Sequence, residues 1–330
     1  MPGLLISHAF HHKHNERLAA LESELGFDVD HIVMPEDPDG RVGSDDLRQA
    51  TLAFFSSDIY PSHSRQFFAA AQGAENLEWM HIFPAGSDFP LFQDFLKRGI
   101  RLTNSSGASA VPIAQTAIAG LLMLARGFPH WLDAQRRRSW EPLADAGVPG
   151  DLSTQTMLVV GVGAIGREIS RLGQALGLYV IGVRRSPRDA DDPVDEMHTP
   201  SELPGLYPRA DWLAIAAPLT AETEGLIDSA ALDALPAGTA LLNVGRGPIV
   251  DEAAMTERLA TGALSGAYLD VFEEEPLSES SKLWELPNVI ISPHNSAAST
   301  GNAGRVTEIF FDNYQRWASG NALLNEVSPA

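Results

Sequence analysis

The chain has 330 residues, of which 44% are hydrophobic and 20% are charged, and it contains no cysteine. This composition is that of a globular protein long enough for two domains, and it excludes disulfides and thiol catalysis. A formal net charge of −20 argues against binding to nucleic acid or to an anionic membrane. The longest apolar run, 113–125, suits a buried helix, and the first residues lack a basic leader, so we expect a cytoplasmic protein.

The first third of the chain reads as an α/β unit. Apolar runs predict strands at 3–7, 51–56 and 77–83, and helical spacing predicts helices at 15–25 and 61–72. Four histidines lie between the first strand and the first helix, where we expect a loop: His8, His11, His12 and His14. Because no compact set of Asp or Glu accompanies them, we predict no metal site.

A joint rich in Ser and Gly, 103–109, separates this unit from a long apolar helix predicted at 111–126. The next strand, 156–160, runs into a G-x-G-x-x-G turn formed by Gly161, Gly163 and Gly166. In such a turn the first glycine makes the bend, the second lets the backbone approach a pyrophosphate, and the third lets helix pack on strand. The helix that follows presents its N-terminus to the phosphates, so the segment predicts a dinucleotide-binding unit.

The strand predicted at 178–183 ends in Arg184, Arg185 and Ser186, where an NAD-specific site would carry an Asp or Glu. Guanidinium groups and a hydroxyl suit a ribose 2′-phosphate. Their position directly after a strand favours this interpretation over that of a solvated loop. We therefore predict that NADP(H) is preferred and that NAD(H) is possible.

Further strands are predicted at 212–216, 240–244, 267–271 and 289–292, and they alternate with helices. This alternation predicts a Rossmann-type, doubly wound parallel sheet. Ligands bind such sheets beyond the carboxyl ends of the strands.

Polar residues stand at those strand ends, among them Arg246, Glu275 and His294. Reduction of a 2-keto acid needs a cation for the substrate carboxylate and a general acid for the keto oxygen. Arg246 suits the first task and His294 the second. Glu275 would orient the imidazole and favour its protonated form.

Several motifs resemble those of the D-isomer-specific 2-hydroxyacid dehydrogenase family. They are P-L-T-A-E-T-E-G-L-I (218–227), L-L-N-V-G-R-G-P-I-V-D-E (241–252), G-A-Y-L-D-V-F-E-E-E-P-L (266–277) and N-V-I-I-S-P-H (288–294). The stretch W-M-H-I-F-P-A-G-S-D within 78–88 is similar to the family's substrate loop. With the glycine turn, the resemblance is strong from about residue 104 to 300.

The resemblance implies roles for individual residues. Arg246, Glu275 and His294 match the family's catalytic Arg, Glu and His, and the N–H groups of Ala85 and Gly86 would hold the substrate carboxylate. The cofactor contacts that it implies, besides the glycines, are Ala164, Ile165, Pro218, Thr223, Val244, Gly245, Arg246, Asp270, His294 and Ser296. One departure is that Asn295, Ser296 and Ala297 follow the histidine where many relatives have an apolar residue and glycines.

The resemblance also implies a split, smaller, flavodoxin-like substrate domain of residues 1–103 and 298–330, with 104–297 forming the dinucleotide-binding domain. The branch implied is that of glyoxylate and hydroxypyruvate reductases, which reduce small 2-keto acids, including pyruvate-like ones, to D-2-hydroxy acids. Relatives are usually homodimers. The alternative is a nucleotide-sensing, corepressor-like binding protein on the same fold.

Overall fold

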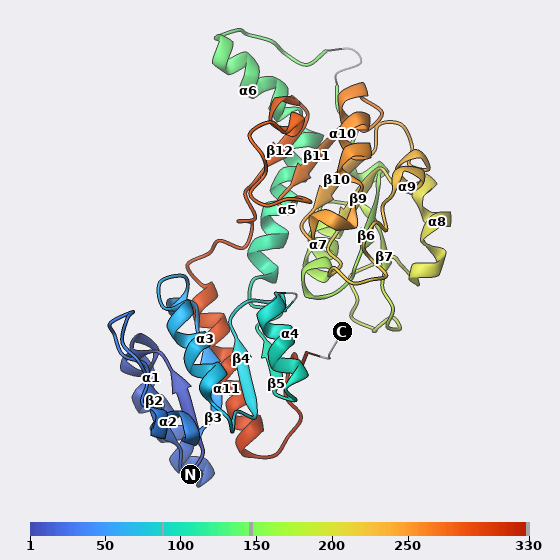
Figure 1. Cartoon of the computed structure of the whole chain (residues 1–330). Coiled ribbons are helices and arrows are strands. Elements are labelled where there is room, and N and C mark those ends of the chain that lie inside the picture. Colours follow the sequence, from blue (N-terminus) through green and yellow to red (C-terminus); the bar gives the residue numbers. More distant parts are fainter. Residues whose placement is uncertain (88, 145–147, 328–330) are drawn as a thin grey trace. The chain divides into compact units, whose positions relative to one another are not determined.

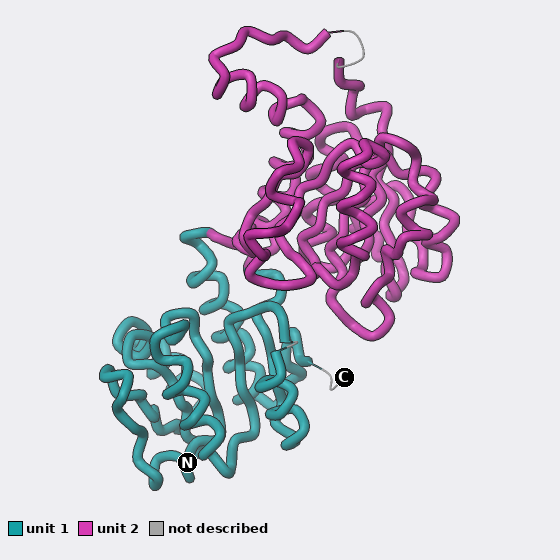
Figure 2. Tube along the Cα trace, turned by 45° about the horizontal axis from the view of Figure 1, so that its top comes forward, with its two compact units in different colours: residues 1–108, 299–330 teal, residues 109–298 magenta. Residues whose placement is uncertain are grey.

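The computed structural model describes residues 1–87, 89–144 and 148–327. The chain divides into two compact units, Met1–Ala108 with Ser299–Ala330 (unit 1) and Ser109–Ala298 (unit 2) (Figure 2). The first boundary lies five residues beyond the expected 103/104, because Asn104 and Ser105 hydrogen-bond to the loop after residue 82 and stay with unit 1. The second lies one residue beyond the expected 297/298.

Unit 1 is built on a five-stranded parallel sheet with the order β2-β1-β3-β4-β5 (Figure 1). The strands are β1 Gly3–Ile6, β2 Asp30–Val33, β3 Ala50–Phe55, β4 Trp79–Ile82 and β5 Arg101–Asn104. The helices are α1 His8–Leu25, α2 Ser44–Gln49, α3 Ser64–Gly73, α4 Pro90–Lys97 and α11 Asn302–Ala318. This is the flavodoxin strand order, which confirms the flavodoxin-like prediction.

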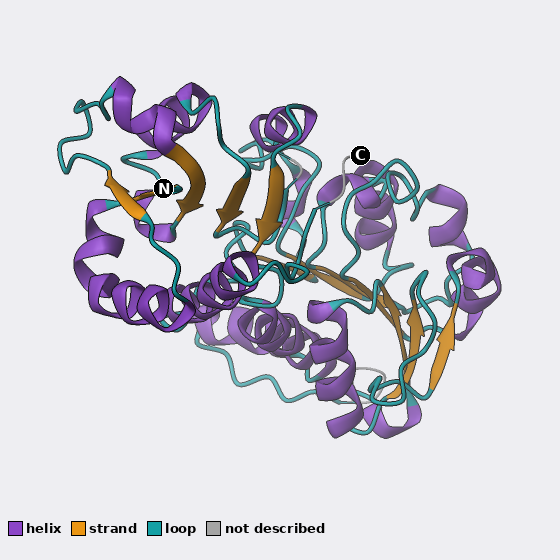
Figure 3. Cartoon of the chain, turned by 90° about the horizontal axis from the view of Figure 1, so that it is seen from below, coloured by secondary structure: helices purple, strands orange, loops and turns teal. Residues whose placement is uncertain are grey.

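Successive residues of these strands are buried on opposite faces of the sheet. Phe54 on β3 packs with Phe10 of α1 and Phe310 of α11, whereas its neighbour Phe55 packs with Phe67 of α3. Figure 3 shows helices on both sides of the sheet. Burial on both faces explains why the strands read as apolar runs and not as alternating patterns.

The prediction of a loop at residues 8–14 is wrong, since α1 begins at His8. Ser7 caps the helix, its Oγ accepting the N–H of Phe10 at 2.9 Å, and Phe10 is buried in the core. Because histidine is a weak helix former, the N-cap and the buried aromatic ring decide the local structure. No group of three His, Asp or Glu side chains in the described part of the chain is arranged to hold a metal ion.

Unit 2 is built on a seven-stranded parallel sheet with the order β12-β11-β10-β9-β6-β7-β8 (Figure 1). The strands are β6 Thr156–Val160, β7 Tyr179–Val183, β8 Glu196–His198, β9 Trp212–Ile215, β10 Ala240–Asn243, β11 Gly266–Leu269 and β12 Val289–Ile291. The helices are α5 Ala110–Ala125, α6 Phe128–Arg137, α7 Ala164–Ala175, α8 Leu203–Leu206, α9 Ser229–Asp233 and α10 Glu252–Thr261. The order reverses at β6, as in a Rossmann sheet, and the predicted fold class is confirmed.

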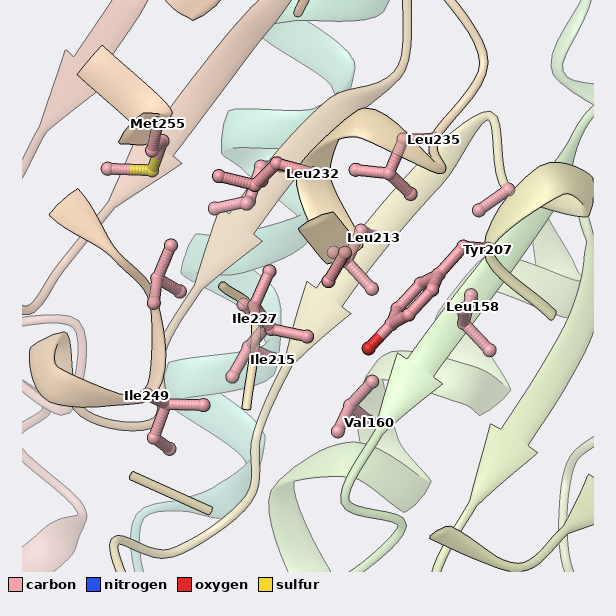
Figure 4. Close-up of a cluster of buried hydrophobic side chains, with 14 of the residues drawn as sticks. Leu158, Val160, Tyr207, Leu213, Ile215, Ile227, Leu232, Leu235, Ile249 and Met255 are labelled. Atoms are coloured by element: carbon pink, nitrogen blue, oxygen red, sulfur yellow. The ribbon is translucent and has the colours of Figure 1, made fainter. Parts of the chain in front are cut away.

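One face of this sheet packs on α8, α9 and α10, where Leu158, Val160 and Ile215 meet Tyr207 and Leu232 (Figure 4). The other face packs on α5 and α7. All neighbouring strands are parallel, so every strand ends at the same edge of the sheet. That edge therefore receives the residues that follow each strand.

Among the described residues, no single helix is long and apolar enough to cross a membrane. Helices α5 and α6 meet the length and composition criteria only as a pair, and a bend of 70° separates them.

Candidate active site

The glycine turn after β6 has the geometry that a dinucleotide site needs. Gly161 has φ +94°, and a Cβ there would lie 2.5 Å from the backbone nitrogen of Ala217; a Cβ on Gly166 would clash with the carbonyl of Gly161. A Cβ on Gly163 would meet nothing within 4 Å. Helix α7 begins at Ala164 without a side-chain cap, so its first N–H groups face this open space. The turn fits a pyrophosphate.

Arg184, after β7, is largely buried, with 11% of its side chain exposed. Its guanidinium pairs with Asp189 at 2.9 Å and with the buried carboxylate of Asp192 at 2.7 Å. It also donates to the carbonyls of Val162, Ser186 and Pro187. These contacts use the donors of the guanidinium to organise the 184–192 loop, a role that differs from the predicted one of binding a 2′-phosphate.

Arg185 and Ser186, by contrast, are exposed at the sheet edge. The pKa of Glu222 is lowered by a hydrogen bond from Thr220, with a smaller contribution from the positive charge of Arg185. The turn after β9 is closed by Thr223, whose Oγ donates to the carbonyl of Pro218 at 2.6 Å. Thr223 thus shapes the backbone of this turn.

The turn after β10 presents Arg246. Asn243, which is buried, accepts the N–H of Gly245 at 3.1 Å and donates to the carbonyl of Arg246 at 3.1 Å. Nη1 of Arg246 donates to the carbonyl of Gly245 at 2.8 Å. Val244, before the turn, is buried and pairs with Ile215 of β9.

The Arg246 turn lies directly against the loop after β11. A Cβ on Gly247 would clash with the backbone of Phe272, so only glycine allows this approach. Two glutamates lock the same pair of segments: the N–H of Glu273 donates to Glu252 at 3.0 Å, and the N–H of Glu252 donates to Glu273 at 3.4 Å. The segments that carry Arg246 and Glu275 are therefore held together.

Glu275 and His294 form a direct pair. Oε2 of Glu275 lies 2.7 Å from Nδ1 of His294, and Oε1 accepts the N–H of Phe272 at 3.1 Å. The side chain of His294 is 48% exposed. Glu275 therefore fixes a proton on Nδ1 and leaves Nε2 for another partner.

Asp270 shapes the segment that carries His294. Its buried carboxylate accepts Oγ of Ser292 at 2.5 Å, the N–H groups of Asn295 and Ser296 at 2.9 and 3.0 Å, and Oγ of Ser296. The N–H of His294 donates to the carbonyl of Asp270 at 2.8 Å, and His294 has φ +49°. Several hydrogen bonds thus stabilise a left-handed conformation that is unfavourable for a non-glycine residue. Asp270 and Ser296, predicted as cofactor contacts, organise this loop.

In unit 1, Ala85 and Gly86 follow β4. Asn104 donates to the carbonyl of Ala85 at 2.7 Å, and the N–H of Ser105 donates to the carbonyl of Pro84 at 3.2 Å. The peptide bonds here are trans, so each N–H points away from the carbonyl of its own peptide. The N–H groups of Ala85 and Gly86 therefore face away from residues 104–105.

Sequence reasoning missed the residues that arrange the site. They are Asn104, Ser105, Asn243, Glu252, Glu273 and Ser292. The only local signal was their proximity in sequence to strand ends and predicted site residues.

The model of the D-isomer specific 2-hydroxyacid dehydrogenase NAD-binding domain matches residues 118–296. A glyoxylate reductase of Aeropyrum pernix is 32% identical over 238 residues, covering 70% of each chain. The solved structure of a D-isomer specific 2-hydroxyacid dehydrogenase from Xanthobacter autotrophicus, in complex with NADPH and MES, is 27% identical and superposes with a TM-score of 0.76 over 99% of this chain and 98% of that one.

An NADPH-dependent glyoxylate/hydroxypyruvate reductase of Sinorhizobium meliloti, solved with citrate, is 27% identical, with a TM-score of 0.74 over 100% of this chain and 98% of that one. The family model covers more than half of the chain, and the glyoxylate reductase is more than 30% identical over 70% of its own length. The chain belongs to the D-isomer-specific 2-hydroxyacid dehydrogenase family, and it is an NAD(P)-dependent oxidoreductase that acts on CH–OH donors.

Proposed function

We propose that the protein is an NADPH-preferring reductase that converts small 2-keto acids, such as glyoxylate, hydroxypyruvate and pyruvate-like acids, to D-2-hydroxy acids. The observation that carries this proposal is the contact of 2.7 Å between Nδ1 of His294 and Oε2 of Glu275 at the edge of the dinucleotide-binding sheet. The names of the relatives support the substrate class.

Three side chains of unit 2, those of His294, Glu275 and Arg246, take distinct roles in the proposed reaction. The reduced nicotinamide nucleotide held at the glycine turn would, when bound, provide the hydride for the keto carbon. His294 donates the proton on Nε2 to the keto oxygen, and Glu275 stabilises the imidazolium before transfer and orients the ring afterwards. Arg246 binds the substrate carboxylate and polarises the carbonyl. In oxidation, the neutral His294 accepts the hydroxyl proton.

Unit 1 contributes backbone donors. The N–H groups of Ala85 and Gly86 would bind the substrate carboxylate. The carbonyls of the same two peptide groups, those of Pro84 and Ala85, accept hydrogen bonds from Ser105 and Asn104, so the N–H groups point to the other side. Peptide N–H groups bind an anion through their partial positive charges, which locally offset the repulsion between a carboxylate and a chain of net charge −20.

For the cofactor, Gly161, Gly163 and Gly166 with the start of α7 would hold the pyrophosphate, and Arg185 with Ser186 would bind the 2′-phosphate. Two observations support this preference. Arg185 is exposed whereas Arg184 is engaged by Asp189 and Asp192, and a related structure contains NADPH. Because Arg185 still carries its charge toward solvent, it is the residue able to pair with a phosphate.

The test is a panel of glyoxylate, hydroxypyruvate, pyruvate and 2-ketobutyrate, assayed with NADPH and with NADH. We expect turnover of at least one acid, with kcat/KM higher for NADPH. Chiral analysis of the product should give the D-isomer. Binding of NADPH without turnover of any acid would overturn the proposal and favour the nucleotide-sensing alternative.

We further propose a cytoplasmic homodimer. The reaction consumes a reduced nicotinamide nucleotide, which the cytoplasm maintains. Helix α6 and the residues after it expose Phe128, Trp131 and Trp140, and Trp140 is 97% exposed. Large exposed aromatic side chains mark association surfaces, and we infer that they are covered by a second copy. Sedimentation of the parent and of Trp140→Ser tests this, with weaker self-association expected for the variant.

A further inference from the structure

A second histidine, His81 on β4, is fully buried in unit 1 and has no part in the proposed chemistry. Burial lowers the pKa of His81 to about 3, so the ring is neutral at working pH. Nδ1 lies 2.7 Å from Oγ of Thr103, and Nε2 lies 3.1 Å from Oγ of Ser105. Both ring nitrogens are thus satisfied, and the ring links the side chains of Thr103 and Ser105.

The neighbouring bonds fix the direction of every hydrogen. Nε1 of Trp79 can only donate, so Oγ of Thr103 accepts it at 2.8 Å and keeps its own hydrogen available for Nδ1 of His81. Oγ of Ser105 donates to the carbonyl of Ile82 at 3.1 Å, so it accepts the hydrogen on Nε2 of His81. Because burial keeps the ring neutral, Nδ1 then carries no hydrogen and accepts that of Thr103, and Nε2 is the protonated nitrogen.

Ser105 is the point at which this network reaches the loop of residues 83–87. Its hydroxyl holds the carbonyl of Ile82, and its N–H holds the carbonyl of Pro84 at 3.2 Å. Asn104 holds the next carbonyl, that of Ala85, at 2.7 Å. Three carbonyls of the strand end and loop are thus anchored on one side, which turns the N–H groups of Ala85 and Gly86 to the other.

We propose that His81 is a positioning residue for substrate binding: by donating to Ser105 it fixes the segment that directs the Ala85 and Gly86 N–H groups toward the substrate carboxylate. This inference rests on the proposed function of that loop. His81 itself touches neither substrate nor cofactor, so its effect must appear in the affinity for the keto acid.

The experiment compares Ser105→Ala, His81→Asn, His81→Gln and the double variant Ser105→Ala/His81→Asn in the full chain. Asn can replace the acceptor at Nδ1 but not the donor at Nε2, whereas Gln can place an amide N–H near Ser105. We expect Ser105→Ala and His81→Asn to raise KM for the keto acid by about tenfold, the double variant to add little to either, and His81→Gln to restore part of the loss. The dissociation constant of NADPH, which reports on unit 2, should not change.

Thr51→Val is the matched control, because Oγ of Thr51 is buried without a partner among the described residues and lies at the opposite end of the neighbouring strand β3. Its KM should equal that of the parent. A KM within twofold of the parent for Ser105→Ala and His81→Asn, or additive effects in the double variant, would overturn the inference.

Hydrogen exchange separates this inference from the proposed function. Amides of residues 83–87 should exchange faster in Ser105→Ala and in His81→Asn than in the parent and in Thr51→Val, with or without a substrate. Unchanged exchange would refute the positioning role. Faster exchange in a protein that reduces no keto acid would refute the proposed function while keeping the role of His81 in the loop.

Discussion

His81, within β4 near its carboxyl end, and His294, in the loop after β12, are the same residue type, yet they differ in burial and in hydrogen-bond partners. His81 is fully buried between two hydroxyl groups, whereas His294 is 48% exposed and pairs with a carboxylate. Burial between hydroxyl partners keeps the His81 ring neutral. At His294 the carboxylate of Glu275 instead fixes the orientation of the ring and leaves Nε2 open. The partner and the burial, not the residue type, distinguish the two histidines.

Arg184 and Arg185 repeat this contrast at adjacent positions. The first is enclosed by Asp189 and Asp192, and the second is exposed. A charge already matched within the chain stabilises a loop, whereas an unburied one is able to meet a ligand.

The largest effect is expected at the exposed histidine. In His294→Gln we expect kcat for the keto acid to fall by about 10² to 10⁴-fold, because the proton donor is lost, while NADPH binding is retained. Steady-state kinetics and a fluorescence titration measure the two quantities. The control is His198→Gln, which removes another histidine paired with glutamates, Glu196 and Glu202; it lies on β8, the outermost strand on the side of the sheet away from β12. A loss below tenfold in His294→Gln would remove the residue from the role of acid.

The buried histidine, His81, should affect how the free energy of unfolding depends on pH. Its folded pKa of about 3 lies below the unfolded value near 6.5, so the unfolded chain binds the proton first as the pH falls. The contribution of the neutral His81 to the free energy of unfolding is therefore fully present above about pH 6.5 and is lost as the pH falls toward 3. About 2 kcal/mol is lost between pH 7 and pH 5. Chemical denaturation of the parent and of His81→Gln at both pH values measures this contribution. Equal pH dependence in the two proteins would contradict the assignment.

The smallest effect concerns the two arginines. Arg185→Ala should lower the preference for NADPH over NADH by about tenfold, because one phosphate contact is removed. Arg184→Ala should leave that preference unchanged and instead lower the free energy of unfolding, since it leaves the buried Asp192 with less compensation. The ratio of kcat/KM values with the two cofactors and a denaturation curve separate the outcomes. If Arg184→Ala changed the preference for NADPH and Arg185→Ala did not, the 2′-phosphate contact would be assigned to Arg184 instead.

Much of the fold could be predicted because its signals are local. The strand at 156–160, the glycine turn and the helix after it appear as predicted, with α7 beginning at Ala164. The flavodoxin-like and Rossmann-type sheets are also confirmed. The loop predicted at 8–14 is wrong because its helix depends on the burial of Phe10 against α11, a segment 300 residues away.

The candidate site divides in the same way. The residues with chemistry of their own, Arg246, Glu275 and His294, could be selected from the sequence because parallel strands bring their ends to one edge. The residues that position these side chains could not be selected from the sequence. Asp270 accepts hydrogen bonds from the loop that follows His294, and Gly247 is needed because the backbone of Phe272 packs against it. Their roles are set by neighbours that the sequence does not display.

By itself the sequence determined the parallel sheet of unit 2, the order of the polar strand ends and the dinucleotide turn, since each follows from short-range periodicity and glycine spacing. The flavodoxin-like form of unit 1 was expected only from the resemblance to the family. Only the tertiary structure decided which histidine and which arginine are buried, and which backbone groups remain to face a ligand. Burial and hydrogen-bond direction depend on how segments distant along the chain pack together, and the identity of a residue does not fix either one.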